Sequence, residues 1–190
     1  KSSIWPLVYY KGFYQTEKYF KDIDDDIRSA FTFNTELITD KNRMLESEIL
    51  SNSNAVSLHV RRGDYLQPKH WNAIGCVCRK EYYNNAIAEI RKRINSPHFY
   101  VFSDDIDWVK ENFEFEKVTY IDWNTGNDSW QDMMLMSRCK HNIIANSTFS
   151  WWGAWLNPNK SKIVIAPNRW FANSEAPNII PDSWVKVKTN

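Results

Sequence analysis

Residues 55–65 read AVSLHVRRGDY, an apolar run that ends in two arginines, a glycine and an aspartate. A short run rich in apolar and β-branched side chains, bounded by polar or turn residues, is typical of a buried strand. The polar break Ser51–Asn54 precedes this one. We therefore predict a strand over Ala55–Val60 and a loop over Arg61–Leu66 at its carboxyl end.

The rest of the chain repeats this pattern, with short apolar runs alternating with helical stretches. A helix is predicted after the first run because Tyr83, Ile87, Ile90 and Ile94 share one face. Strands that alternate with helices form a parallel sheet covered on both faces, so we predict an α/β, Rossmann-like fold. The remaining predicted strands are His98–Phe102, Lys117–Ile121, Asn142–Ala145 and Lys162–Ala166; the remaining helices are Ile106–Phe113, one that Ser129 caps, and Thr148–Leu156.

The first fifty residues lack this alternation. Thr16–Phe20, Asp24–Phe31 and a stretch around Met44–Leu50 read as helical. Nothing in this segment has a catalytic pattern. We interpret residues 1–50 as a helical linker or interdomain segment and residues 51–190 as the Rossmann-like domain.

Composition excludes several classes of protein. The 190 residues carry 24 basic and 23 acidic side chains, and a net charge of +1 disfavours a nucleic-acid binder. No apolar run approaches the roughly 18 residues that span a bilayer. Three cysteines, with Cys76 and Cys78 as the closest pair, predict reduced thiols and neither a zinc site nor a disulfide framework. Ten tryptophans fit either a large core or a sugar or base pocket.

Ligands of open parallel sheets bind beyond the carboxyl ends of the strands, where two loops here favour an anion. Arg61 and Arg62 have guanidinium groups that match phosphate oxygens, and Gly63 lets a ligand approach the backbone. The alternative is a surface turn whose arginines pair with Asp64 and other carboxylates. His59 shares the strand face of Arg61, and we read it as a ligand contact or a satisfied structural group.

The second anion loop is NSTFS, residues 146–150, between a predicted strand and a helix. Free N–H groups at a helix start attract anions, although ordinary capping explains the same residues. Neither loop contains a P-loop or a G-x-G-x-x-G sequence, which disfavours those nucleotide-binding classes. Ser103, Asp104 and Asp105 follow the second strand and favour a helix opening over a metal or base site, while Asp132 fits a ligand contact or a helix start. Trp123–Asp128 is the remaining loop at this edge.

The motif HVRRGDY, residues 59–65, resembles the H-x-R-R-G-D-Y signature of the alpha-1,2-fucosyltransferases of glycosyltransferase family 11. Three further blocks resemble the same family in the same order: FSDD (102–105), DMMLMSRC (132–139) and NSTFSWW (146–152). The stretch GFYQTEKYF, residues 12–20, is similar to the family's interdomain segment. The resemblance covers nearly the whole chain.

This resemblance implies an inverting enzyme of GT-B type that transfers L-fucose from GDP-fucose to the 2-hydroxyl of a terminal galactoside, without a metal or other cofactor. The family's G-G-L-G-N-Q motif is absent here. We therefore expect the donor-binding C-terminal half without the first domain, and the isolated chain is not assumed to be active. The expected partners are GDP-fucose and a galactoside acceptor, with no nucleic acid and an open oligomeric state.

The resemblance also assigns roles to residues. Arg61 and Arg62 would face the donor pyrophosphate, with Asp64 bracing them or acting as the base; we favour the brace. His59 and Asp132 would contact the nucleoside. The expected catalytic residues are Arg61, Arg62 and Asp64, and the expected GDP-fucose contacts are His59, Gly63, Ser103, Asp104, Asp132, Asn146, Ser147, Thr148, Phe149 and Ser150.

Two other functions remain open from the sequence. One is a non-catalytic nucleotide- or polyanion-binding module, and the other is a carbohydrate-binding module with a tryptophan-rich surface. The predicted α/β alternation disfavours the second, because such modules are usually sandwiches. The expected location is the bacterial cytoplasm, with a peripheral association with the inner membrane, and the Golgi lumen is the alternative.

Overall fold

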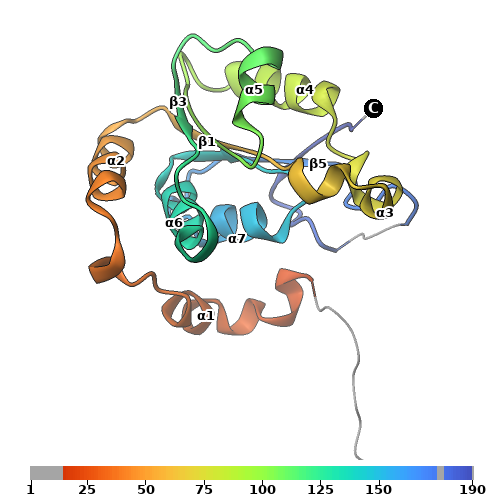
Figure 1. Cartoon of the computed structure of the whole chain (residues 1–190). Coiled ribbons are helices and arrows are strands. Elements are labelled where there is room, and N and C mark those ends of the chain that lie inside the picture. Colours follow the sequence, from red (N-terminus) through yellow and green to blue (C-terminus); the bar gives the residue numbers. More distant parts are fainter. Residues whose placement is uncertain (1–14, 175–177, 190) are drawn as a thin grey trace, which may run out of the picture.

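The computed structural model describes residues 15–174 and 178–189, and within them six strands form one parallel sheet (Figure 1). The strand order is β3-β2-β1-β4-β5-β6, which is the doubly wound order of Rossmann folds. The predicted parallel sheet is thus confirmed. The strands are β1 (Ala55–Val60), β2 (His98–Ser103), β3 (Val118–Ile121), β4 (His141–Ile143), β5 (Val164–Pro167) and β6 (Val185–Val187).

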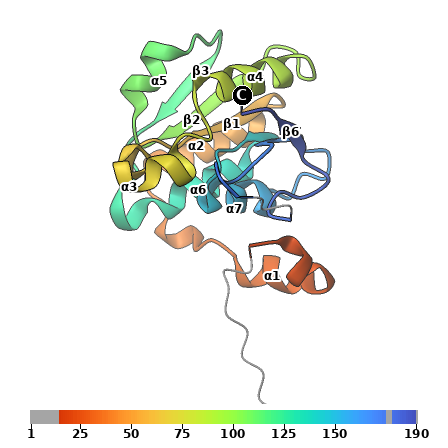
Figure 2. The same ribbon diagram turned by 90° about the vertical axis from the view of Figure 1, so that its right-hand side faces the viewer.

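Helices cover both faces of the sheet, as the alternation predicted. The core residues place α4 (Lys80–Arg91) and α5 (Ile106–Asn112) on one face. The other face is covered by α2 (Asp40–Ser51), α6 (Trp130–Arg138) and α7 (Thr148–Leu156) (Figures 1 and 2). The shorter elements are α1 (Asp24–Ala30), α3 (Pro68–His70), a π-helical turn at Trp71–Gly75, and 3-10 turns at Glu17–Tyr19, Lys21–Ile23, Thr35–Leu37, Gly63–Leu66 and Gly126–Asp128.

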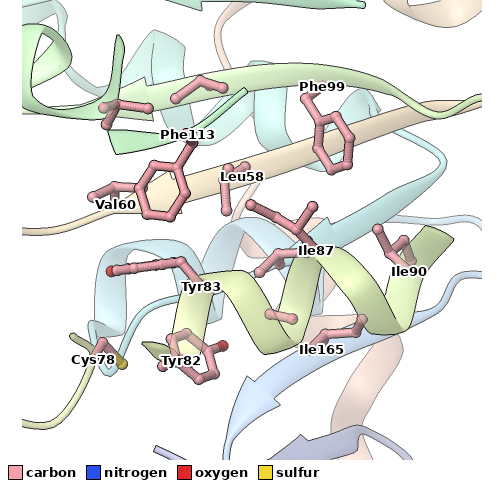
Figure 3. Packing of buried hydrophobic residues seen from close by; sticks show 14 of the residues in the cluster. Leu58, Val60, Cys78, Tyr82, Tyr83, Ile87, Ile90, Phe99, Phe113 and Ile165 are labelled. Carbon is pink, nitrogen blue, oxygen red and sulfur yellow. The ribbon is translucent and has the colours of Figure 1, made fainter. Parts of the chain in front are cut away.

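Strand β1 is the centre of the core. All six of its residues are buried, because α4 and α5 cover one face and α6 the other. Leu58 and Val60 point toward Tyr83, Ile87 and Phe113 (Figure 3). A strand buried on both faces has no polar side, which explains why its sequence does not alternate strictly between apolar and polar residues.

The limits of the five predicted strands agree with the structure to within two residues, and one strand was not predicted. β1 coincides with the prediction, whereas β4 ends at Ile143, before the predicted Ala145. Strand β6 was missed. It has only three residues, its middle residue is the exposed Lys186, and it lies at the sheet edge, so it carries almost no apolar pattern.

Four of the ten tryptophans belong to the core at α7, and filling a core was one of the two roles that the sequence left open for them. Trp151, Trp155, Trp170 and Trp184 are buried together. The segment before α2 packs here as well: Phe31 stacks on the ring of Trp152 with the ring centroids 4.8 Å apart. Residues 12–14, the start of the motif GFYQTEKYF, lie outside the described part of the chain.

Helix α2 shares the core of the sheet domain. Leu45 and Ile49 are buried in the same cluster as Leu135 and Met136 of α6. Arg138 adds an ion pair across this contact, with its Nε 2.7 Å from an Oε of Glu46. The second half of the predicted linker is therefore packed directly against the domain that follows it.

Two findings bear on cellular context. Within residues 15–174 and 178–189, no helix has the length and apolar character needed to cross a membrane. The three cysteines are free thiols, and Cys78 and Cys139 are buried. Burial raises the pKa of both buried thiols, so they stay protonated at neutral pH.

Removing the side chain of Leu58 tests the central role of β1. We expect Leu58→Ala to lower the free energy of unfolding by about 2–5 kcal/mol, because it leaves a cavity in a fully buried strand. Urea denaturation followed by circular dichroism measures this. The control is Leu50→Ala, since Leu50 lies on α2 with half its surface exposed, and should change stability by less than about 0.5 kcal/mol. Equal losses in both variants would contradict this account of the core.

Candidate active site

A cleft of about 860 Å³ opens at the carboxyl ends of β1, β2 and β3, next to the start of α7. This is the edge at which the sequence predicted a ligand. Among the predicted site residues, those that line the cleft are His59, Arg61, Asp64, Ser103, Asp104, Asp132, Ser147, Thr148 and Phe149. Arg62, Gly63, Asn146 and Ser150 are not among its lining residues.

Arg61 is held between two carboxylates at the cleft. One of its terminal nitrogens lies 2.7 Å from Asp64 Oδ1, and the other lies 3.0 Å from Asp104 Oδ2. The two ion pairs fix the plane of the guanidinium group. Its side chain remains about one-third exposed, so it can still meet a ligand in the cleft.

Arg62 points elsewhere. Its Nε donates to Asp105 Oδ2 over 2.9 Å, and its guanidinium carbon lies 3.8 Å from the ring centroid of Trp108. Both partners belong to the β2–α5 region, so these contacts fasten the loop after β1 to the neighbouring loop. Both arginines therefore have the carboxylate-paired geometry that the sequence left as the alternative for this motif, and of the two only Arg61 also lines the cleft.

A side chain of the protein packs closely against the backbone of Gly63. A Cβ atom at this position would lie 2.5 Å from Asp104 Oδ2, closer than real contacts allow. Asp104 in turn accepts the Arg62 backbone N–H at 2.9 Å. Gly63 was predicted to admit a ligand, which stays a prediction; the structure shows that it makes room for Asp104, the carboxylate that pairs with Arg61.

The start of α7 forms another wall. Ser147 occupies the N-cap position with extended backbone, and no described side chain caps this end by a hydrogen bond. The first N–H groups of a helix lack intrahelical partners and carry the positive end of its dipole, so this wall suits an anion. Asn146 and Ser150 support it from behind: Asn146 donates to the carbonyls of Ile74 and Trp170, and Ser150 donates to the Ser147 carbonyl.

His59 reaches the floor of the cleft from β1. It is 5% exposed, and its Nδ1 is buried without a hydrogen-bond partner among the described residues. Burial, aided by the charge of Arg61, lowers the pKa of His59 to about 3, so the ring is neutral at physiological pH. Its ring lies beside Phe149, with the centroids 5.8 Å apart. A buried nitrogen without a partner is costly, and a hydrogen-bonding ligand would remove that cost.

Asp132 enters from the first turn of α6. Burial raises its pKa to about 7, while a hydrogen bond from Asn124 opposes that rise. The Asn124 Nδ2 lies 2.7 Å from Asp132 Oδ1. This carboxylate is thus poorly hydrated and is shared between its ionised and protonated forms near neutral pH.

The loop between β3 and α6, which the sequence placed at this edge as Trp123–Asp128, forms a wall, although none of its residues was predicted as a ligand contact. Asn124, Thr125, Gly126 and Ser129 all line the cleft. The position of this loop after a strand was the available signal, since it lies at the same sheet edge as the other three. Tyr65, also missed as a site residue, lines the cleft and donates to the Asn146 carbonyl over 3.0 Å.

The cleft has a strongly uneven charge. The described residues that line it include six aspartates and one arginine, Arg61. Two of the aspartates, Asp64 and Asp104, are paired with that arginine. A phosphate is therefore favoured only near Arg61 and the start of α7, and the carboxylates on the other walls suit ligand groups that donate hydrogen bonds. Among the described residues, no group of three or more potential ligands is placed to hold a metal ion.

Comparisons with known proteins agree with the motifs. The sequence profile of "Glycosyl transferase family 11" matches residues 3–188. The chain is 39% identical over 186 residues to Alpha-1,2-colitosyltransferase of Escherichia coli, which covers 95% of this chain and 63% of that protein. It is 32% identical over 160 residues to Galactoside alpha-(1,2)-fucosyltransferase 1 of Saimiri boliviensis boliviensis, which covers 80% of this chain and 43% of that one.

A solved structure, NodZ alpha-1,6-fucosyltransferase soaked with GDP-fucose, aligns with a TM-score of 0.47 and 19% identity over 71% of this chain and 47% of that one. The chain spans less than two thirds of the length of the two curated relatives. The profile match nevertheless runs through all four ordered motifs. The chain therefore belongs to glycosyl transferase family 11.

Proposed function

We propose that this chain is the donor-binding portion of an inverting glycosyltransferase of GT-B type that moves L-fucose from GDP-fucose to the 2-hydroxyl of a terminal galactoside. Family membership and the alpha-1,2 transferases among its relatives support the reaction class. One structural observation carries the proposal further: Arg61 and the start of α7 line the same cleft at the carboxyl edge of the sheet. Together they suit a diphosphate.

The diphosphate would lie between the Arg61 guanidinium and the N–H groups at the start of α7. When the bond from fucose C1 to the phosphate oxygen breaks, negative charge grows on the departing GDP. Groups that are already oriented stabilise that charge more in the transition state than in the ground state. Asp64 and Asp104 supply this orientation for Arg61, and we assign both as braces. No metal is needed for this role, and metal independence stays a prediction.

The nucleoside would occupy the side of the cleft near Asp132 and His59. A guanine ring offers N1–H and 2-amino donors, which an ionised carboxylate accepts. The neutral His59 would use its unpartnered Nδ1 on the same ligand. Phe149, which packs beside His59, provides an apolar surface at this point.

The acceptor hydroxyl would attack from the face of the sugar opposite to GDP. Its proton requires a base, and Asp64 is the carboxylate of the arginine motif nearest to this chemistry. Because Asp64 Oδ1 is engaged by Arg61 at 2.7 Å, we keep Asp64 as a brace and look for the base among groups that the acceptor-side domain supplies.

Colitose is a second candidate for the donor sugar. The relative named for colitosyl transfer shares 39% identity with this chain, against 32% for the relative named for fucosyl transfer. Colitose is L-fucose without its 3-hydroxyl group. The two candidate donors differ at the 3-hydroxyl group of the sugar, and the proposed diphosphate chemistry is the same for both.

The two other functions fit less well. A polyanion-binding module needs a broadly positive surface, whereas the described lining of the cleft is mainly acidic. A carbohydrate-binding module on a tryptophan-rich surface conflicts with the burial of Trp151, Trp155, Trp170 and Trp184. We propose a cytoplasmic location, which three free thiols and the Escherichia coli relative support.

The full-length gene product tests the reaction directly. Incubated with lactose and GDP-fucose or GDP-colitose, it should form a 2-linked product whose anomeric configuration is read by NMR. A preference for GDP-colitose would move the assignment to the second donor. Nucleotide binding without any transfer from either donor would favour the non-catalytic module.

Arg61→Ala should weaken GDP binding by about tenfold to a hundredfold, the loss of one or two charge-assisted hydrogen bonds. Guanosine, which has no phosphate, should bind the variant as it binds the parent chain. Isothermal calorimetry with both ligands gives the comparison. Arg62→Ala is the matched control and should change GDP affinity less than about threefold, because Arg62 faces Asp105 and Trp108. An equal loss in both variants would refute the assignment of the diphosphate to Arg61.

The binding of GDP-fucose should depend on pH through Asp132. Its pKa lies at about 7, so the carboxylate accepts hydrogen bonds above that pH and loses this ability as it is protonated below. We expect a plateau above about pH 8 and a fall approaching tenfold per unit well below pH 7. GDP-fucose is the suitable ligand because the terminal phosphate of GDP itself titrates near pH 6. Asp132→Asn should bind more weakly with a flat profile, and a flat profile in the parent chain would exclude this role.

A further inference from the structure

We propose that Asn124 and Asn42 are positioning residues that hold the Asp132 carboxylate in the orientation that reads the guanine edge. The inference rests on the proposed function, which assigns Asp132 to the nucleoside. It adds two residues that neither the motifs nor the family match single out. One of them, Asn42, comes from the segment that the sequence suggested was only a linker.

Asn124 connects the cleft to the interior. It lines the cleft, is 8% exposed, and donates from Nδ2 to Asp132 Oδ1 over 2.7 Å. A carboxylate has room for about four hydrogen bonds on its two oxygens. The Asn124 bond therefore fixes the plane of the carboxylate while leaving Oδ2 and part of Oδ1 for a ligand.

Asn42 fixes Asn124 in turn. It is fully buried on α2, and its Nδ2 donates to Asn124 Oδ1 and to Gln131 Oε1, each over 2.7 Å. Its Oδ1 accepts from Trp123 Nε1 at 2.8 Å and from Asn124 Nδ2 at 3.3 Å. Both ends of the Asn42 amide are thus occupied, which leaves it a single favourable orientation.

The hydrogen bonds run in one direction, from Asn42 to Asn124 and from Asn124 to Asp132. Because Asn42 donates to the carbonyl of Asn124, the Asn124 amide must turn its NH2 group toward Asp132. The reverse orientation would bring an amide oxygen against a carboxylate oxygen, which is repulsive. A purely apolar contact between α2 and the β3–α6 loop would hold the two elements together but would impose no orientation on the carboxylate.

The ligand chemistry that benefits is the recognition of guanine. A carboxylate facing the N1–H and 2-amino groups accepts two roughly parallel hydrogen bonds, and this needs its plane to match that of the ring. Hypoxanthine keeps N1–H and lacks the 2-amino group, so inosine diphosphate loses one of the two bonds. The ratio of GDP affinity to IDP affinity therefore reports on the orientation of Asp132.

The experiment compares GDP and IDP binding by calorimetry at pH 8 in the parent chain, Asn124→Ala, Asn124→Ser and Asn42→Ala. We expect the parent to prefer GDP and the variants at Asn124 to lose about fivefold to tenfold of that preference. Asn42→Ala should lose preference in the same direction. Thermal unfolding of each variant checks that it is folded at the temperature of the titration.

Asn157→Ala is the matched control. Asn157 is also a buried asparagine in an amide network, donating to Asn142 Oδ1 and to the Cys139 carbonyl, and it does not line the cleft. Its loss should lower the melting temperature and leave the preference for GDP unchanged. An unchanged preference in folded Asn124 variants that bind GDP would overturn the inference alone. If the parent chain binds neither nucleotide, the proposed function fails first.

A pH profile with GDP-fucose provides a second readout, which a purely structural role would not move. The Asn124 bond lowers the pKa of Asp132, so its removal should shift the midpoint of binding to higher pH, while Asn157→Ala should leave the midpoint in place. An unmoved midpoint in Asn124→Ala would count against the inference. The other titratable groups that line the cleft stay intact in every variant; they are His59, Arg61, Asp64, Tyr65, Asp104, Asp105, Asp107 and Asp122.

Discussion

The burial of β1 on both faces is the constraint on which the rest of the structure depends. The helices that cover β1 connect successive strands and return the chain to the same end of the sheet, so the strands run parallel. The carboxyl ends of the strands therefore meet at one edge. At that edge, His59 near the end of β1 lies at the floor of the cleft and Arg61, just after the strand, lies at its wall. Short loops are therefore enough to complete the site.

The carboxylates around Arg61 fix the orientation of its guanidinium group and weaken its attraction for an anion. Two carboxylates flank Arg61, so a diphosphate in the proposed site would meet a guanidinium that is already partly neutralised. Under the proposed function, the ground-state affinity for the diphosphate would be lower than an unpaired arginine would give. In the proposed reaction, the oriented group would need little reorganisation when charge develops on the leaving phosphate, and stabilisation that appears only in the transition state is what raises the rate. Gly63 fits this arrangement, since any side chain there would displace Asp104.

The features that could be predicted from the sequence are those that depend on the length and composition of short segments. The runs that became β1, β2 and α7 have the length and composition of their elements, and the edge of a parallel sheet then locates the loops. The direction in which Arg62 points could not be predicted, because it depends on Asp105 and Trp108, more than forty residues away in sequence. Strand β6 is held by its pairing with β5 and has too little apolar character to be visible alone.

Asn42 shows why a local reading of the first fifty residues was incomplete. Its partner Asn124 lies 82 positions further along the chain, and asparagine on a helix is ordinarily an exposed or capping residue. Only the packing of α2 on α6 buries it, and once buried its amide must be satisfied. The same packing that adds Leu45 and Ile49 to the core therefore places the Asn42 amide against Asn124, which lines the cleft. In the proposed site, α2 thus supports the carboxylate that contacts the nucleotide, and a movement of α2 relative to the sheet would change the orientation of Asp132 through Asn42 and Asn124.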